Sequence, residues 1–203
     1  MKDTAPARRA LQKDRTRGRI LEAARQAFAS SGYHRTLVDD VAREAGVSKG
    51  AVYVHFPSKE DLFLALLDDA AGTLAERVTS AIGAAQGARG RVGAALRAAL
   101  GAFEENEALT RLLLLESVGL SPEVERRRWE LRCALAALVQ GYLDEAVSEG
   151  DIPAQDTALA AAAWLGAVSE VVLRWLHDRN PPLREAVPAL TALLLRSVGF
   201  PEA

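Results

Sequence analysis

The 203-residue sequence predicts an all-α protein, with a small N-terminal three-helix domain and a larger C-terminal helical domain. Alanine and leucine are abundant and aromatic residues make up only 5% of the chain, which favours helices over sheets. Apolar residues recur at helical spacing between breaks of Gly, Pro, Ser and Asn, and no stretch alternates as a strand does. The proportions of 49% hydrophobic and 26% charged residues are those of a globular protein.

Residues 1–13 are polar and basic and include Pro6, so they predict a flexible basic arm. We expect such an arm to add affinity for DNA by entering a minor groove, if the protein binds DNA. From Asp14 onward apolar residues recur at helical spacing, which predicts the first helix. Gly32 is suited to the position just after its end, where a left-handed backbone is common.

Two short helices are predicted next, and together they form a helix-turn-helix. Thr36, with Asp39 three residues later, has the pattern of a capping box at a helix start. Gly46 ends that helix, and Ser48 caps a third helix that runs through Phe56. Small residues at the crossing allow a steep angle between the helices. One inward face is expected to be shared by both helices: Val38, Val41, Ala45, Val47, Val52 and Phe56.

The remaining helices are longer. Pro57 breaks the chain, and Ser58 with Glu60 and Asp61 predicts the start of a helix that reaches about Ile82. Connections are expected at residues 83–90, at Asn106 and at 119–122, with helices between them. The last three helices are expected over residues 122–149, 156–177 and from 183 to about Gly199.

The charge distribution points to nucleic acid. Residues 1–60 contain 12 Lys and Arg against 7 Asp and Glu, a net charge of +5, whereas residues 61–203 contain 13 against 20, a net charge of −7. A basic segment joined to an acidic body is typical of a nucleic-acid-binding module attached to another domain. The outward face of the third helix is short, partly basic and able to form hydrogen bonds, as a helix that reads the major groove requires. The alternative is a structural corner between two helices with no DNA contact.

The helix-turn-helix carries a specific resemblance. Residues 48–61, Ser-Lys-Gly-Ala-Val-Tyr-Val-His-Phe-Pro-Ser-Lys-Glu-Asp, closely resemble the recognition-helix signature of TetR-family repressors. Residues 19–33 resemble the first helix of that family, and the similarity covers roughly residues 14–66. It implies a DNA-binding domain over residues 14–57, and a ligand-binding and dimerisation domain over residues 58–203. The implied function is a repressor that binds a palindromic operator as a homodimer and is released by a small hydrophobic effector.

The resemblance also implies which residues contact DNA. They are Thr36, Ser48, Lys49, Gly50, Ala51, Tyr53, Val54, His55 and Lys59. Thr36, Tyr53, His55 and Lys59 match phosphate-contacting positions, and Gly50 allows close approach of the backbone. Val54 departs from the family pattern, which often has a polar or aromatic residue there. Readout at Val54 is therefore either a contact with a thymine methyl group or absent.

The C-terminal domain is expected to hold the effector and the partner subunit. The inward-looking stripes of the middle helices predict a ligand pocket formed by Phe103, Leu109, Leu112, Leu113, Glu116, Trp129, Cys133 and Trp164. Glu116 is a candidate for a cation, and Arg132 or Arg174 for an acidic head group. Residues 156–177 are apolar nearly all round, which requires burial on two sides. The predicted dimer interface consists of Trp164, Val168, Val171, Val172, Trp175, Leu190 and Leu194.

Other classes of function have little support. The three histidines are scattered, Cys133 has no metal-spaced neighbour, and no nucleophile elbow or phosphate-binding glycine loop is present, so we expect no enzyme, metal or cofactor. A helical interaction module that does not bind an operator is the remaining alternative. A single cysteine, the lack of a secretory apolar core and an apolar run of only 11 residues (158–168) predict a cytoplasmic protein without a membrane span.

Overall fold

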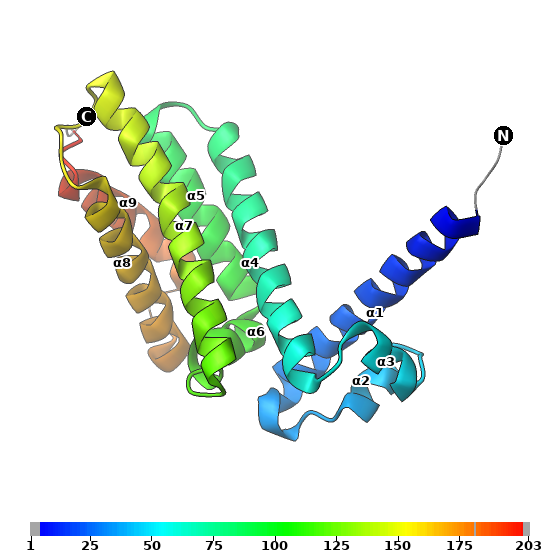
Figure 1. The fold of residues 1–203 in the computed structure, drawn as a ribbon. Helices are drawn as coiled ribbons and strands as arrows, with labels where there is room; N and C mark the ends of the chain where they lie inside the picture. The colour runs from blue at the N-terminus through cyan, green and yellow to red at the C-terminus, as the bar shows by residue number, and fades with distance from the viewer. Residues whose placement is uncertain (1–4, 181, 201–203) are drawn as a thin grey trace. The chain divides into compact units, whose positions relative to one another are not determined.

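A computed structural model describes residues 5–180 and 182–200, and these residues form helices joined by short turns, with no strand among them (Figure 1). The predicted all-α class is therefore confirmed. The chain forms two compact units. The first comprises Met1–Asp69 and Arg111–Glu125, and the second comprises Ala70–Thr110 and Arg126–Ala203. This division differs from the expected boundary at residues 57 and 58.

The first unit contains the three N-terminal helices and the start of the fourth. They are α1 (Ala5–Arg35), α2 (Val38–Glu44), α3 (Lys49–His55) and the first turns of α4 (Lys59–Gly83). The expected break at Gly32 is confirmed, because its φ of 75° interrupts the helical backbone of α1. Figure 1 shows α2 and α3 beside the middle of α1.

Helix α1 begins well before the expected start at Asp14. Residues 5–13 are helical, so the prediction of a flexible arm over residues 1–13 is wrong for its described part. The segment contains several alanines and Leu11, which are strong helix formers. Pro6 lies in the first turn, where its missing N–H is not needed. Residues 1–4 lie outside the described residues.

The core of the first unit is centred on one face of α1. Ile20, Ala24 and Phe28 are fully buried, and the Phe28 ring packs edge-on against Phe63 of α4 with the centroids 5.5 Å apart. The expected inward face of the helix-turn-helix is confirmed, apart from a half-buried Val47. Burial of apolar area rather than helix propensity must hold α2 and α3 in place, since helices of seven residues are too short to be stable alone.

A π-helical segment completes the first unit. The chain passes from α6 (Glu107–Arg111) directly into the π-helix η1 (Leu112–Glu116), which the sequence analysis did not predict. Leu112 and Ser117 are buried, and η1 packs against α1. A carboxylate oxygen of Glu116 lies 2.9 Å from the position that a Cβ atom on Gly32 would occupy. Gly32 therefore allows both the break in α1 and the close packing of η1 against this part of α1.

The second unit is a bundle of long helices. Besides most of α4 it contains α5 (Gly87–Glu105), α7 (Pro122–Glu149, from Arg126 onward), α8 (Thr157–Asp178) and α9 (Leu183–Ser197). The expected limits of α7 are confirmed, and those of α8 are confirmed to within one residue. Helix α9 packs mainly against α5 and also against α8. Leu96 and Leu100 of α5 are buried, as are Leu190 and Leu194 of α9.

Helix α8 is long and apolar enough to cross a membrane, by length and composition only. The sequence analysis predicted no membrane-spanning segment because the apolar run 158–168 ends at Ser169 and Glu170. These two residues do not make the helix as a whole polar, so its average hydropathy stays high. A core helix of a globular protein meets the same test. Trp164, Val172 and Trp175 of α8 are buried within the second unit, whereas Leu159 is 67% exposed.

The turn between α2 and α3 requires a special backbone conformation. Gly46 has a φ of 61°, and its carbonyl accepts a hydrogen bond of 3.3 Å from Nη2 of Arg19 on α1. The same guanidinium nitrogen donates to the carbonyl of Ala45. A Cβ atom on Gly46 would lie 2.9 Å from that nitrogen, so any larger residue would also displace Arg19.

We predict that Gly46→Ala lowers the stability of the first unit by at least about 1–2 kcal/mol, the cost of a left-handed conformation for a residue with Cβ. Thermal unfolding followed by circular dichroism would measure the effect. Gly18→Ala is the matched control, because Gly18 is helical and nothing lies within 4 Å of its Cβ position. The control should be stabilised by roughly 0.5–1 kcal/mol. Equal melting temperatures for the two variants would contradict the assigned role of Gly46.

Candidate nucleic-acid interface

Helix α3 has a buried side and an exposed side. Val52 is 1% exposed and packs into the core, whereas Val54 is 74% exposed and Tyr53 is 41% exposed. Lys49 and Gly50 are also exposed, at the first turn of the helix. Ser48 caps this turn as predicted, because its Oγ accepts a hydrogen bond of 3.2 Å from the backbone N–H of Ala51. The outer face of α3 therefore presents the ammonium of Lys49, the phenol of Tyr53, the methyl groups of Val54 and the exposed backbone at Gly50.

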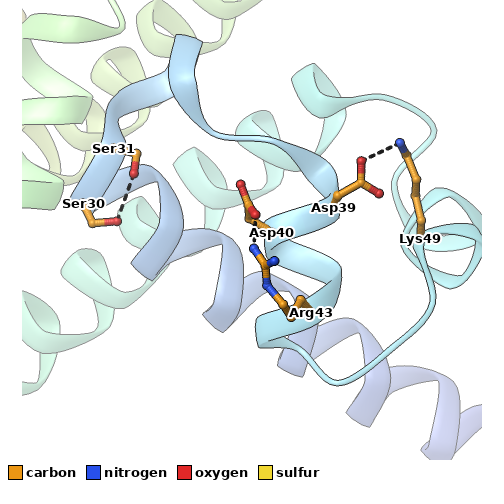
Figure 2. Close-up of polar contacts among 6 residues, drawn as sticks. All are labelled: Ser30, Ser31, Asp39, Asp40, Arg43 and Lys49. Atoms are coloured by element: carbon orange, nitrogen blue, oxygen red, sulfur yellow. Dashed lines mark hydrogen bonds and ion pairs between the residues drawn. The ribbon is translucent and has the colours of Figure 1, made fainter.

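Lys49 is held by an acidic residue of the preceding helix. Its Nζ donates to Oδ2 of Asp39 on α2 over 2.8 Å, and both side chains are largely exposed (Figure 2). This hydrogen bond and the carboxylate charge raise the pKa of Lys49, so the ammonium stays protonated. A second exposed pair, Asp40 with Arg43, lies along α2 itself (Figure 2). Any anion that binds Lys49 must compete with Asp39.

Lys59 lies at the start of α4 and contacts the end of α1. Its Nζ donates to the carbonyl of His34 over 3.2 Å and lies 4.5 Å from the centre of the Tyr33 ring. Partial burial lowers the pKa of Lys59. Ser58 caps α4 as predicted, since its Oγ accepts from the N–H of Asp61 over 3.0 Å. The ammonium is thus fixed at the start of α4 and remains half-exposed.

Thr36 does not have the predicted arrangement. Its side chain is buried, and the hydroxyl donates to the carbonyls of Ala27 and Gly32 at 3.1 and 2.8 Å. The residue that precedes α2 is Leu37, which forms no side-chain cap. The capping box with Asp39 is therefore wrong, and the buried hydroxyl is not available to a phosphate. The physical reason is the positive φ of Gly32, which turns the end of α1 toward Thr36.

Two arginines of α1, which no local sequence pattern identified, contact the helix-turn-helix. Arg19 binds the carbonyls of the α2–α3 turn, and the Arg17 guanidinium lies 5.1 Å from the centre of the Phe56 ring, just after α3. Next to Phe56, the half-buried His55 has a buried Nδ1 atom without a hydrogen-bond partner in the described part of the chain. Sequence periodicity cannot predict a contact between residues that are 26 or more positions apart. Only the basic charge of α1 could therefore be inferred from the sequence.

The predicted ligand-pocket residues are divided between the two units. Leu112, Leu113 and Glu116 belong to the first unit, whereas the other five belong to the second. Trp129 is 66% exposed and Cys133 is exposed, so their inward placement on α7 is wrong. Residues 129–137 are apolar on most sides of the helix, and their spacing could not indicate which side faces the core.

The other predicted pocket residues lie deeper. Phe103 and Leu109 are half-buried, and Trp164 is buried with its Nε1 donating to Oγ of Ser197 over 3.0 Å. Glu116 is exposed, and no cluster of three or more His, Cys, Asp or Glu that could hold an ion occurs among residues 5–180 and 182–200. These placements leave the effector site a prediction.

The predicted dimer-interface residues belong mostly to the core of the chain itself. Five of them are buried within the second unit, and Val168 and Val171 are half-buried. The exposed apolar side chains of α8 and α9 are instead Leu159 and Leu193, at 67% and 51% exposure. The dimer interface stays a prediction, and the exposed positions of α8 and α9 are those that a partner subunit could reach.

Comparison with protein families identifies both parts of the chain. A family model described as bacterial regulatory proteins, tetR family, matches residues 20–66. A second, described as tetracyclin repressor-like, C-terminal domain, matches residues 85–196. The first covers the helix-turn-helix and the start of α4, and the second covers more than half of the chain.

Individual relatives align over most of their length. The fatty acid metabolism regulator protein of Bacillus subtilis is 28% identical over 183 residues, which are 88% of this chain and 93% of that protein. The transcriptional activator FasR of Mycolicibacterium smegmatis is 28% identical, over 84% of this chain and 77% of that protein. The structure of FadR from B. subtilis in complex with stearoyl-CoA matches with a TM-score of 0.79 and 25% identity, over 91% of this chain and 98% of FadR.

The ion pair between Lys49 and Asp39 generates a prediction for DNA affinity. Asp39→Asn should release the ammonium and strengthen binding to random-sequence duplex DNA several-fold, with a salt slope steeper by about one phosphate contact per subunit. Fluorescence anisotropy at several salt concentrations would measure both quantities. Asp40→Asn is the matched control, because it removes the same charge from the same helix but leaves Lys49 paired. If both variants gain equally, Lys49 does not contact DNA.

Proposed function

The chain belongs to the TetR family of bacterial transcriptional regulators, and from this premise we propose that it represses transcription by binding a palindromic operator as a homodimer until a small hydrophobic effector releases it. The observation that carries the proposal is the outer face of α3, whose side chains are exposed while its inner face is fixed by the core. The family consists of regulatory proteins, and the chain is not an enzyme. Because its target is chromosomal DNA, we place the protein in the cytoplasm.

We assign the reading of DNA to α3. An α-helix fits the major groove, which is about 12 Å wide. In our assignment Ser48, Lys49, Gly50 and Ala51 approach the backbone or base edges at the first turn of the helix. The exposed methyl groups of Val54 are suited to a thymine methyl group, and the Tyr53 hydroxyl to a phosphate.

Two further residues flank the reading helix in this assignment. Lys59 provides a positive charge at the start of α4, and its contacts with His34 and Tyr33 hold it in one position. His55 follows at the end of α3, where its unpartnered Nδ1 limits it to a contact through the other side of the ring. Thr36 is not part of the proposed interface, because its hydroxyl is used within the protein.

The proposed dimer interface uses the outer side of α8 and α9. Leu159 and Leu193 are exposed there, and small residues surround them on the exposed positions of the two helices: Ala158, Ala162, Ala163 and Ala189. Small side chains allow helices of two subunits to approach closely. A symmetric pair of such faces would form an isologous interface, and a two-fold dimer reads an inverted repeat.

For the effector we propose a long-chain fatty acyl-CoA. The support is the alignment of most of this chain with the fatty acid metabolism regulator protein of B. subtilis and with the structure of B. subtilis FadR, which holds stearoyl-CoA. FasR is named a transcriptional activator, so activation is the alternative to repression for this chain. The position of the selected operator relative to the promoter distinguishes repression from activation.

We predict that the protein in solution has twice the 21.7 kDa mass of the chain, and that selection from random-sequence DNA recovers an inverted repeat. Leu159→Glu combined with Leu193→Glu should dissociate the dimer, because two carboxylates would be buried unpaired in an apolar interface. Light scattering and operator titration would follow both effects. Val118→Glu is the control, since Val118 is 59% exposed in the first unit.

A monomeric wild-type protein would refute the proposed symmetry. A dimer that recovers no preferred sequence from random DNA would refute operator binding and would favour the alternative of a helical interaction module.

We predict that stearoyl-CoA releases the protein from its operator, whereas free coenzyme A does not. A coupling of about a hundredfold, or about 3 kcal/mol, would change operator occupancy markedly. Linkage requires that the operator weaken stearoyl-CoA binding by the same factor. Calorimetric titrations of acyl-CoA with and without the operator would test this, and equal affinities in the two titrations would exclude the mechanism.

A further inference from the structure

Helix α7 has an exposed apolar face. Trp129, Cys133, Ala137 and Gly141 recur every four residues along it, and all four are exposed. Trp129 is 66% exposed, whereas Ala146 on the opposite side of the helix is buried in the second unit. Exposed aromatic side chains next to small residues are typical of surfaces that bind another protein.

Two opposite charges lie at the two ends of this face. Arg126 is exposed before Trp129, and Asp144 is exposed after Gly141. At about 100° per residue, the six positions 126, 129, 133, 137, 141 and 144 fall within about 120° of the helix circumference. Thr157 of α8 donates to Oδ1 of Asp144, which fixes the carboxylate and leaves its second oxygen for another donor. We call these six residues the α7 face.

The α7 face is arranged symmetrically about residue 135. Trp129 and Gly141 lie six residues to either side of this point, and Arg126 and Asp144 lie nine residues to either side. A two-fold axis at residue 135 therefore places Trp129 of one copy against Gly141 of a second, antiparallel copy. The same axis places Arg126 against Asp144. One axis thus matches the largest side chain with the smallest residue and the positive charge with the negative one, so the surface fits a second copy of the chain.

The packing of such a pair is sterically possible. Residues four apart form a ridge on a helix, and two ridges of this kind interdigitate when the helices cross at about −50°. Nothing lies within 4 Å of the position of a Cβ atom on Gly141, so the site is open to an indole ring. Cys133 and Ala137 lie next to the crossing point, where small side chains allow two helices to approach closely.

We propose that the α7 face is a self-association surface, by which one copy of the protein binds a second copy in antiparallel orientation. It lies on a different helix from the α8–α9 interface of the proposed function and does not depend on that interface. Two of the proposed dimers would therefore be joined into a tetramer.

The size of the α7 face sets the strength of this association. From Trp129 to Gly141 it is about 18 Å long, at about 1.5 Å per residue. A contact between single helices of this length buries less than the roughly 1,000 Å² expected of a stable interface. We therefore expect a dissociation constant between micromolar and millimolar, so that dilute solutions contain the smaller species.

The first test follows the mass of the full-length protein by sedimentation equilibrium, from micromolar to near-millimolar concentration. The mass should rise toward twice that of the dilute species. Trp129→Ala should weaken the association by about tenfold or more, as expected for a central aromatic residue of an interface. Gly141→Gln should have a similar effect, because its side chain would occupy the position of Trp129 from the second copy.

Charge reversal tests the antiparallel pairing directly. Arg126→Asp alone and Asp144→Arg alone should each prevent association, because each places like charges opposite one another. An equimolar mixture of the two variants should associate again, since both pairs are then of opposite charge. Arg89→Asp is the matched control, because it reverses the same charge at an exposed position of α5 and should change nothing. Circular dichroism would confirm that each variant folds.

Cys133 provides an independent readout, because it is the single cysteine of the chain. In the proposed pair the two Cys133 residues are about 6 Å apart along the helix axis, at about 1.5 Å per residue. A short bis-maleimide should therefore cross-link two copies of the concentrated wild-type protein, and Trp129→Ala should suppress the cross-link. The variant with Leu159→Glu and Leu193→Glu should still form it.

The outcomes distinguish this inference from the proposed function. A wild-type mass that stays constant up to the highest concentration, or a mixture of the two charge variants that does not associate, would overturn the inference alone. A monomeric dilute protein that still cross-links through Cys133 would refute the proposed α8–α9 dimer and support the α7 face.

Discussion

The arrangement of α2 and α3 depends on how the carbonyl groups at the end of α2 are satisfied. The last carbonyls of a helix have no partner within it and form the negative end of its dipole. Arg19 of α1 donates to the carbonyls of Ala45 and Gly46, where the missing Cβ of Gly46 leaves room for the guanidinium. One side chain therefore connects α1 with the turn that orients α3. Together with the buried apolar faces of α2 and α3, this connection sets which face of α3 is exposed.

Local signals in the sequence were sufficient wherever an element is determined by neighbouring residues. The caps at Ser48 and Ser58 and the break at Gly32 were predicted because a cap or a positive φ is specified within a few positions. The outer face of α3 could be predicted for the same reason, since its inner residues follow a clear helical period. Most of the fold and the centre of the candidate interface were thus accessible from the sequence alone.

The features that could not be predicted depend on contacts between distant segments. Threonine is a residue type that often caps helices, but the hydroxyl of Thr36 donates to two carbonyls of α1 instead. Trp129 faces outward on α7. The alanine-rich sequence of this helix does not indicate which of its sides packs against the other helices. The helical start of α1 at residues 5–13 was hidden by its charge, because basic residues are as common in a flexible arm as in a helix. In each case the sequence allowed two arrangements, and tertiary contacts or helix continuity selected one.

The boundary between the two compact units bears on the coupling of effector and DNA binding in the proposed function. The chain crosses it three times, between residues 69 and 70, 110 and 111, and 125 and 126. Two of these crossings lie inside the helices α4 and α7, and the third lies where α6 continues into η1. Domain boundaries usually fall in flexible linkers, which explains why no compositional signal marked this one. Because helices carry continuous backbone hydrogen bonds, a displacement of α4 or α7 in the second unit is transmitted to the first rather than absorbed by a loop. An effector therefore need not approach the DNA. In the proposed function, it needs only to favour positions of these helices in which the two α3 helices of the proposed dimer would not match the spacing of the operator.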